Sequence, residues 1–351
     1  MNPSSPRAFG RASLRDVVAY TPDADCPIDL SDNTNLWGTP PTALRAFEQA
    51  QSSWLARYPQ GYSETLKDAL AAYAGTTPDH IVVGCGSDDV LDAAIRACAE
   101  PGQRLAMMDP SFVMIPALAR INGLEVVRIP LTPDYGPDAE RLIDADATIT
   151  YLCSPNNPTG VAIDRETIEK IVNETRGFVI VDEAYMEFGG TSAVRLASDR
   201  VLIARTMSKA FGLAGLRIGY GIGAPSLIAE IEKSRGPFKV SAPAEHAALA
   251  ALVHDRDWVA ARVDDAVASR ERLIVALRTL GLSVLQSASN FVLVPHDRSL
   301  AITAALKRRN IAVRGFASLA TVGPAMRITV GPWNVMEQLL ARLQEVLVEC
   351  A

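Results

Sequence analysis

Residues 148–183 read TITYLCSPNNPTGVAIDRETIEKIVNETRGFVIVDE, and this stretch decides the fold class. Thr148–Cys153 and Phe178–Val181 are apolar runs with the length of buried strands, and Arg165–Glu174 between them has the spacing of a helix. A strand, a helix and a strand in this order are typical of a parallel sheet. The polar residues that follow each apolar run should then meet at the carboxyl edge of that sheet, where ligands bind.

The same alternation extends on both sides of this stretch. Further predicted elements are the strands His80–Gly84, Arg104–Met108, Val201–Ala204 and Ile218–Ile222 and the helices Ser87–Ala99 and Phe112–Ile121. Together they predict an α/β fold in which helices cover both faces of a largely parallel sheet.

The pattern changes after Pro237. The predicted elements that follow are the helices Ala244–Val253, Asp257–Leu280, Leu300–Arg309 and Val335–Val348 and the strands Phe291–Val294, Ile311–Arg314 and Met326–Val330. We therefore divide the chain into an N-terminal arm (1–30), a large domain (31–237) and a smaller α+β domain (238–351). The arm is too short to fold alone, and we expect it to pack on the small domain or on a partner subunit.

The composition indicates an enzyme without a nucleic-acid or membrane surface. The 351 residues are 48% hydrophobic and 21% charged, with a net charge of −6. No apolar run is long enough to span a bilayer, and Met1–Leu14 lacks the apolar core of a secretory signal. The five cysteines form no Cys-x-x-Cys pair, and the four histidines have no metal-ligand spacing. We expect reduced thiols, no metal, no nucleic-acid partner and a cytoplasmic location.

Residues 207–217, MSKAFGLAGLR, contain the first candidate for chemistry. Lys209 follows an apolar strand, with Ser208 beside it and Arg217 eight residues later. A neutral lysine amine can form an imine with an aldehyde, and an arginine can hold a phosphate. Pyridoxal 5′-phosphate (PLP) carries both groups. Lys209 by itself is equally compatible with an ordinary surface lysine.

Two strand ends supply further polar groups. Asp182 directly follows the apolar run Phe178–Val181, where its carboxylate could keep a pyridine nitrogen protonated. Asn157 lies in the turn Ser154-Pro-Asn-Asn-Pro-Thr-Gly160 and could donate to a ring oxygen. The alternatives are an aspartate that caps the next helix and an ordinary polar turn.

The segment Gly84-Cys-Gly-Ser-Asp-Asp89 joins a strand to a helix. Glycines and free backbone N–H groups at a helix start form an anion site, and phosphate is the natural occupant. Helix capping by Ser87 or Asp88 is compatible with the same residues. Neither a nucleotide-binding glycine loop nor a Gly-x-Ser-x-Gly nucleophile elbow is present.

Taken together, these segments resemble fold-type I PLP-dependent aminotransferases and, among them, the histidinol-phosphate aminotransferase family. The resemblance covers nearly the whole chain, in order. Its segments are Ala19-Tyr-Thr-Pro22, Asp32-Asn-Thr-Asn-Leu-Trp-Gly38, Arg57-Tyr-Pro59, Gly84-Cys-Gly-Ser-Asp88, Ser154-Pro-Asn-Asn-Pro-Thr-Gly160, Val181-Asp-Glu-Ala-Tyr185, Ser208-Lys-Ala-Phe211, Leu213-Ala-Gly-Leu-Arg217 and Met326-Arg-Ile-Thr-Val-Gly331. It implies a large domain with a mainly parallel seven-stranded sheet, a smaller α+β domain, and a homodimer that acts on an amino donor and a 2-oxo acid.

The resemblance also implies a role for each cofactor residue. Lys209 would form the imine with PLP and later move a proton, and Asp182 would pair with the ring nitrogen. Asn157 and Tyr185 would bond the ring's 3-oxygen, and Phe112 would stack on the ring unless it is simply core. The remaining cofactor-binding residues are Gly86, Ser87, Asp88, Thr206, Ser208 and Arg217, together with Tyr58, which would come from the neighbouring subunit.

Substrate contacts follow from the same comparison. Arg327 matches the family's substrate-anion arginine, and Tyr20 and Arg314 match secondary contacts, although Arg314 could be a surface charge. The other predicted substrate residues are Asn33, Trp37 and Asn290.

Four positions depart from the family's usual residues: Thr34, Leu36, Trp37 and Lys239. Phe112 also stands where tyrosine is commoner. Because the four face the expected substrate, they leave open another PLP reaction on the same fold, such as a threonine-phosphate-type decarboxylase or a tailoring enzyme of secondary metabolism. A non-catalytic PLP-binding module is a further alternative.

Overall fold

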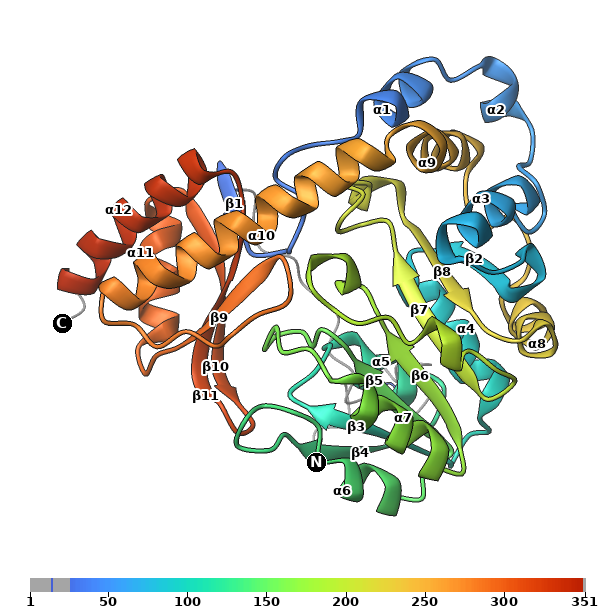
Figure 1. The fold of residues 1–351 in the computed structure, drawn as a ribbon, viewed down its shortest axis with the longest axis horizontal. Helices are drawn as coiled ribbons and strands as arrows, with labels where there is room; N and C mark the ends of the chain where they lie inside the picture. The colour runs from blue at the N-terminus through green and yellow to red at the C-terminus, as the bar shows by residue number, and fades with distance from the viewer. Residues whose placement is uncertain (1–13, 15–25, 350–351) are drawn as a thin grey trace, which may run out of the picture.

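The computed structural model describes residue 14 and residues 26–349, which form two sheets with their covering helices (Figure 1). The larger sheet has seven strands. In sheet order they are β2 (Ile81–Cys85), β8 (Ile218–Ile222), β7 (Val201–Thr206), β6 (Phe178–Asp182), β5 (Ile149–Cys153), β3 (Arg104–Asp109) and β4 (Glu125–Pro130). Only β8 runs antiparallel to its neighbours, so the mainly parallel seven-stranded sheet is confirmed.

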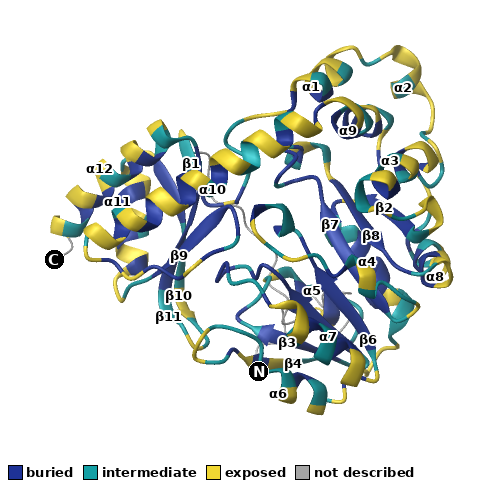
Figure 2. Ribbon diagram, viewed as in Figure 1, coloured by how far each residue is buried: buried dark blue, intermediate teal, exposed yellow. Residues whose placement is uncertain are grey.

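Helices pack on both faces of this sheet. They are α3 (Glu64–Ala74), α4 (Ser87–Cys98), α5 (Met114–Ile121), α6 (Ala139–Asp144), α7 (Arg165–Glu174), α8 (Pro225–Arg235) and α9 (Ala242–His254). The helices α1 (Pro41–Glu48) and α2 (Ser52–Ala56) pack against α9. Every residue of β5, β6 and β7 is buried, as Figure 2 shows by its dark central strands. These strands need apolar side chains on both faces, which explains their continuous rather than alternating runs.

Alternation along the strands divides the interior into two cores. Leu152, Val181 and Ile203 pack in one core, whereas Tyr151 and Ile180 pack in the other, on the opposite face of the sheet. Successive side chains of a strand point to opposite faces. The residues at the carboxyl ends are therefore sorted between the two faces by their position in the chain.

The smaller sheet has four strands, in the order β1 (Ile28–Leu30), β10 (Ile311–Leu319), β11 (Gly323–Thr329) and β9 (Phe291–Pro295). The helices α10 (Arg256–Thr279), α11 (Ser299–Arg308) and α12 (Trp333–Glu349) accompany it. Because β1 pairs in parallel with β10, the end of the predicted arm lies in the small domain. No helix of the described residues is long and apolar enough to cross a membrane.

Several features of the fold were not predicted from the sequence, among them β1 and the helices α1, α2, α3 and α6. The edge strand β4 was missed because most of its residues are partly or fully exposed and it lacks a continuous buried run. Helix α9 packs against α1 and α3, and its alanines share a core with the large sheet. The division after residue 237 stays a prediction, and this packing favours a boundary further along, within α10.

A buried ion pair lies on the side of the large sheet that faces α3 and α9. Glu183 follows β6 and accepts from Arg205 of β7 at 2.8 Å, with side chains 0% and 5% exposed. Arg205 also donates to Ser192 Oγ at 2.7 Å. Removing one partner leaves the other as an uncompensated buried charge, which is strongly destabilising.

We therefore expect Arg205→Met to lower the free energy of unfolding by about 3–5 kcal/mol. Urea denaturation followed by circular dichroism measures this loss. Arg96→Met is the matched control, because Arg96 bonds Asp92 at 2.8 Å on an exposed helix face. The control should change stability by no more than about 0.5 kcal/mol. Equal effects of the two substitutions would contradict the prediction.

Candidate functional site

A cavity of about 610 Å³ lies between the carboxyl edge of the large sheet and strands β10 and β11. Its size is that of a small-molecule site, and its place is where parallel sheets bind ligands. Most of the predicted site residues line it. They are Asn33, Ser87, Asp88, Phe112, Asn157, Asp182, Tyr185, Thr206, Ser208, Lys209, Arg217, Arg314 and Arg327.

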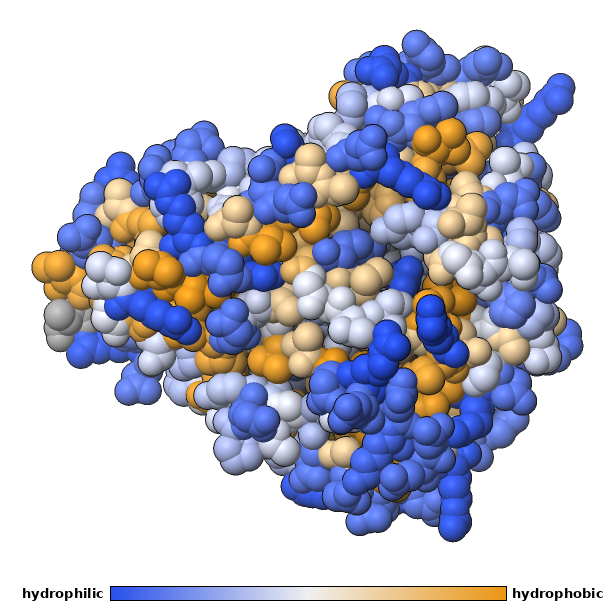
Figure 3. Space-filling view, in the orientation of Figure 1, coloured by the Kyte–Doolittle hydropathy of each residue, from blue (hydrophilic) through white to orange (hydrophobic). Residues whose placement is uncertain are grey.

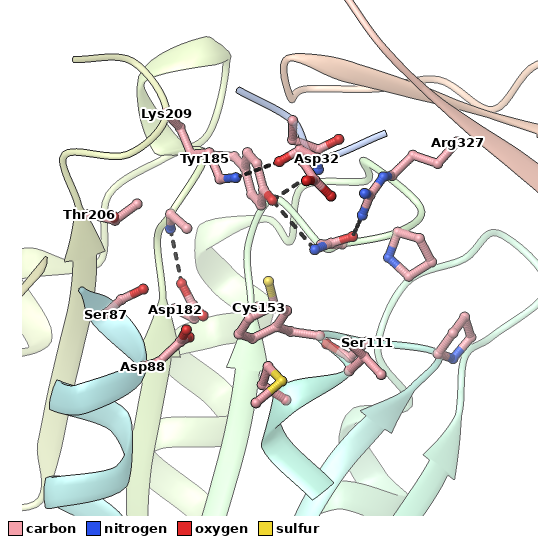
Figure 4. A pocket seen from close by; sticks show the side chains of 18 of the residues that line it. Asp32, Ser87, Asp88, Ser111, Cys153, Asp182, Tyr185, Thr206, Lys209 and Arg327 are labelled. Carbon is pink, nitrogen blue, oxygen red and sulfur yellow. Dashed lines mark hydrogen bonds between the residues drawn. The ribbon is translucent and has the colours of Figure 1, made fainter. Parts of the chain in front are cut away.

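Lys209 lies just beyond β7 and extends into the cavity (Figure 4). Its Nζ donates to the backbone oxygen of Asp32 at 3.0 Å and lies 5.7 Å from the centre of the Tyr185 ring. Burial, together with the positive charge of Arg327, lowers the pKa of Lys209 to about 8. The neutral fraction of the amine near neutral pH is therefore much larger than for an ordinary lysine, and a nucleophile requires the neutral form.

Asp182 is the last residue of β6 and is 2% exposed. Its Oδ1 accepts from the Ala184 backbone N–H at 3.0 Å, and its Oδ2 accepts from the Tyr151 hydroxyl at 2.7 Å. Burial raises the pKa of Asp182 to about 6, and these hydrogen bonds oppose the increase. Asp182 thus makes a local turn contact and lines the cavity, but it caps no helix, because Tyr185 is the N-cap of the short helix Met186–Phe188 that follows.

Gly86, Arg217 and two hydroxyls surround a candidate anion site. Gly86 has a φ of +80°, and a Cβ at this position would lie 2.5 Å from a guanidinium nitrogen of Arg217. Thr206 Oγ1 and Ser208 Oγ lie 2.9 Å apart beside them. Gly86 is the N-cap of α4 and provides no side-chain cap, so the predicted capping by Ser87 or Asp88 is wrong. The helix start is left available for an anion.

Hydrogen bonds connect the asparagines, Tyr185 and Arg327. The Tyr185 hydroxyl accepts from Asn33 Nδ2 at 3.0 Å and from Asn157 Nδ2 at 3.4 Å. Arg327 donates to Asn157 Oδ1 at 2.6 Å. Asn33, predicted as a substrate contact, therefore also orients Tyr185. Asn157 links a candidate cofactor group to a candidate substrate group.

Phe112 lines the cavity next to Ser111 and also packs against the core below it, so both predicted roles find support. Gly86 does not itself line the cavity, and neither do three further predicted residues within the described part of the chain. Trp37 packs between a core of the large sheet and the core of the small sheet. Asn290 is buried and donates to the backbone oxygen of Asn33 at 3.0 Å, and the Tyr58 ring stacks on the Phe238 ring with 4.8 Å between ring centres. Tyr20 lies outside the described residues.

Sequence reasoning missed several residues at this site. Asp32 contacts Lys209, and Tyr151 contacts Asp182. Arg128 lines the cavity and forms a 3.0 Å ion pair with Asp109. Cys153 and Phe316 are further lining residues. The spacing in β5 could have indicated Tyr151 and Cys153, because Cys153 pairs with Asp182 and side chains two residues apart share a face. No such local signal identifies Arg128.

The cavity fits PLP. It has an amine of lowered pKa, a buried acid, an aromatic wall and a cradle that a Cβ at Gly86 would fill. These groups match the aldehyde, ring nitrogen, ring face and phosphate of the cofactor. A strand-end lysine and acid on this sheet define a fold-type I PLP-dependent enzyme.

Comparison with known proteins narrows this class. Residues 26–343 match the family of class I and II aminotransferases. Histidinol-phosphate aminotransferase 1 of Trichormus variabilis is 31% identical, covering 97% of this chain and 99% of its own. The histidinol-phosphate aminotransferase of Methylibium petroleiphilum is 37% identical, with coverages of 98% and 97%.

A solved structure agrees with these relatives. The histidinol-phosphate aminotransferase of Sinorhizobium meliloti in complex with pyridoxal 5′-phosphate has a TM-score of 0.90 and 28% identity, covering 99% of this chain and 100% of its own. The chain belongs to the class I and II aminotransferase family and is a PLP-dependent aminotransferase of the histidinol-phosphate aminotransferase type.

The cradle at Gly86 can be tested by filling it. Gly86→Ala should weaken PLP binding to the apoenzyme by at least about tenfold, because the new methyl group would displace the Arg217 guanidinium and strain a positive φ. Cofactor titration followed by tryptophan fluorescence measures the dissociation constant.

Gly102→Ala is the matched control for this substitution. Gly102 has a φ of +91° but nothing within 4 Å of an added Cβ, so it reproduces the backbone strain without the clash. Its cofactor affinity should stay within about twofold of the wild type, well under the 1.4 kcal/mol of a tenfold change. If both variants lose the same affinity, the cradle interpretation fails.

Proposed function

We propose that this aminotransferase takes its amino group from histidinol phosphate and passes it to a 2-oxo acid such as 2-oxoglutarate. The observation that carries this proposal is the pairing of Arg314 with Arg327 across β10 and β11. Directly paired residues of an antiparallel sheet share a face, and both arginines line the cavity. Two guanidinium groups suit a phosphate dianion, and curated relatives carry the same substrate in their names.

The proposed roles of the other side chains follow from their positions. Lys209 holds the cofactor and then moves a proton at the α-carbon of the donor, for which a pKa of about 8 is suitable. Asp182 supports the protonated ring nitrogen, and Asn157 and Tyr185 hold the ring oxygen. PLP, when bound, supplies an electron-withdrawing ring.

The phosphate and the ring face have their own partners. Phe112 packs against the ring in this proposal. The phosphate is held by Gly86, Ser87, Asp88, Thr206, Ser208 and Arg217, through backbone N–H groups, hydroxyls and the guanidinium, with Asp88 bound to Arg217 at 3.8 Å.

The positions that depart from the family's residues support the same donor. Of the four, only Thr34 lines the cavity. Leu36 packs in the small-domain core, Trp37 lies between the cores, and Lys239 is bound to Asp89 at 3.0 Å. Three of these departures therefore change packing and leave the cavity lining unaltered, which removes the main argument for a different reaction.

A single half-reaction tests the donor. Mixing the holoenzyme with histidinol phosphate should convert the cofactor to its aminated form faster than any other amino donor, and 2-oxoglutarate should restore the original absorbance. Arg314→Met should lower kcat/KM for histidinol phosphate by about 10- to 150-fold, the loss of a hydrogen bond to a charged group. The same variant should have little effect on histidinol, which lacks the phosphate.

Lys209→Ala is the control that should abolish the absorbance change. Release of carbon dioxide from a donor that carries a carboxylate, such as threonine phosphate, or a faster reaction with a donor that lacks a phosphate, would refute the proposed substrate.

We further propose that two copies of the chain form the functional unit. Several large apolar side chains on and near α1 and α2 are exposed, and Tyr58 is 82% exposed. The others are Leu44, Phe47, Leu55 and Phe238. Figure 3 shows orange surface over α9, while the surface over α6 and α7 is largely blue. A second copy would cover the apolar residues and bring its Tyr58 toward the cofactor phosphate.

Mixed dimers test this arrangement. Tyr58→Ala and Lys209→Ala should each lose most activity, and refolding the two together should restore about a quarter of the wild-type activity, because half of the dimers are mixed and each has one intact site. Sedimentation measures the assembly. Absence of complementation in a confirmed mixed dimer would show that Tyr58 does not act across the interface.

We place the enzyme in the cytoplasm and in amino-acid biosynthesis. Cell fractionation checks the location.

A further inference from the structure

The buried acid beneath the cavity has a side-chain partner that sequence comparison did not supply. Asp182 lies at the end of β6 with one oxygen held by the Ala184 backbone and the other by the Tyr151 hydroxyl. Among the described residues, Tyr151 supplies the one side-chain hydrogen bond to Asp182. Its 2.7 Å length is that of a charge-assisted O–H···O⁻ bond.

The sheet register places this tyrosine under the acid. Cys153 pairs with Asp182 and Tyr151 pairs with Ile180 across β5 and β6, so the four side chains share one face. Cys153 lines the cavity, but its Sγ donates to the Pro155 backbone oxygen at 3.4 Å. Tyr151 is fully buried and does not line the cavity, so it acts on Asp182 from below.

In the hydrogen bond between Tyr151 and Asp182, the phenol is the donor and the carboxylate is the acceptor. Burial raises the pKa of Tyr151 far above its usual value, so the phenol stays protonated and donates. Burial also raises the pKa of Asp182, whereas the hydrogen bond from Tyr151 lowers it. A donor to the charged form of an acid stabilises that form and fixes its orientation. A carboxylate supports a protonated ring nitrogen, and a neutral acid supports it much less.

We propose that Tyr151 is a positioning residue that keeps Asp182 ionised and aimed at the ring nitrogen of the cofactor. The proposal concerns the cofactor and does not depend on which donor the enzyme uses. Tyr151 contacts neither substrate nor cofactor and acts only through Asp182.

The test is cofactor titration of the Tyr151→Phe apoenzyme across pH. As the pH is lowered, Asp182 becomes protonated, and the wild-type affinity for PLP should fall with a midpoint near pH 6. Without the hydroxyl this midpoint should move to higher pH. A rise of one pKa unit should lower the affinity about tenfold at pH values below 6 and about twofold near pH 7. Phenylalanine keeps the ring, so the apoenzyme should unfold at a similar temperature.

Two matched variants decide between positioning and general packing. Tyr220→Phe removes another fully buried hydroxyl, from the core on the opposite face of the sheet, and should leave the midpoint unchanged. In an Asp182→Asn background, Tyr151→Phe should change PLP affinity less than twofold, because the ionisable group is gone. Three results would overturn the proposal. They are an unshifted pH midpoint in Tyr151→Phe, an equal shift of the midpoint in Tyr220→Phe, or a loss of PLP affinity on Tyr151→Phe in the Asp182→Asn background as large as in the wild-type background.

Discussion

Parallel pairing of β5, β6 and β7 is the constraint on which the rest of the site depends. Cys153 pairs with Asp182, and Asp182 pairs with Ala204, so the three strands end together at one edge. Alternation then sends Asp182 toward the cavity and Glu183 into the opposite core, where it binds Arg205. Thr206 follows Arg205 and faces the cavity again. A slip of one residue would exchange the residues that line the cavity with those buried in the opposite core.

The residues that could be predicted from the sequence are those with a local signal. The continuous apolar runs of β5, β6 and β7 identified the parallel sheet, and the polar residue after each run marked its edge. Asp182 and Lys209 could be found in this way because an apolar strand places its next residues at a known position. The glycines of the segment Gly84–Asp89 are the local signal for the anion site. Gly86 has a positive φ, which glycine adopts without steric cost.

The remaining residues could not be found because their roles depend on contacts between distant segments. Asp32 approaches Lys209 from 177 positions away, and Arg128 enters the cavity from a half-exposed edge strand that has no continuous apolar run. Trp37 and Asn290 were predicted as substrate contacts, yet one packs between the cores and the other bonds backbone. Their neighbours in the chain or in space, Thr34 and Asn33, do line the cavity, and only side-chain direction separates a lining residue from a supporting one.

The hydrogen bonds of Asn157 connect a candidate cofactor-binding residue with a candidate substrate-binding residue. Its amide donates to Tyr185 and its oxygen accepts from Arg327, which lies on β11 of the small domain. An anion that engages Arg327 would therefore act on the residue that orients Tyr185, and Tyr185 lies over Lys209. Arg327 also lowers the pKa of Lys209 by its positive charge. A donor anion that neutralised the charge of Arg327 would therefore raise the pKa of the Lys209 amine.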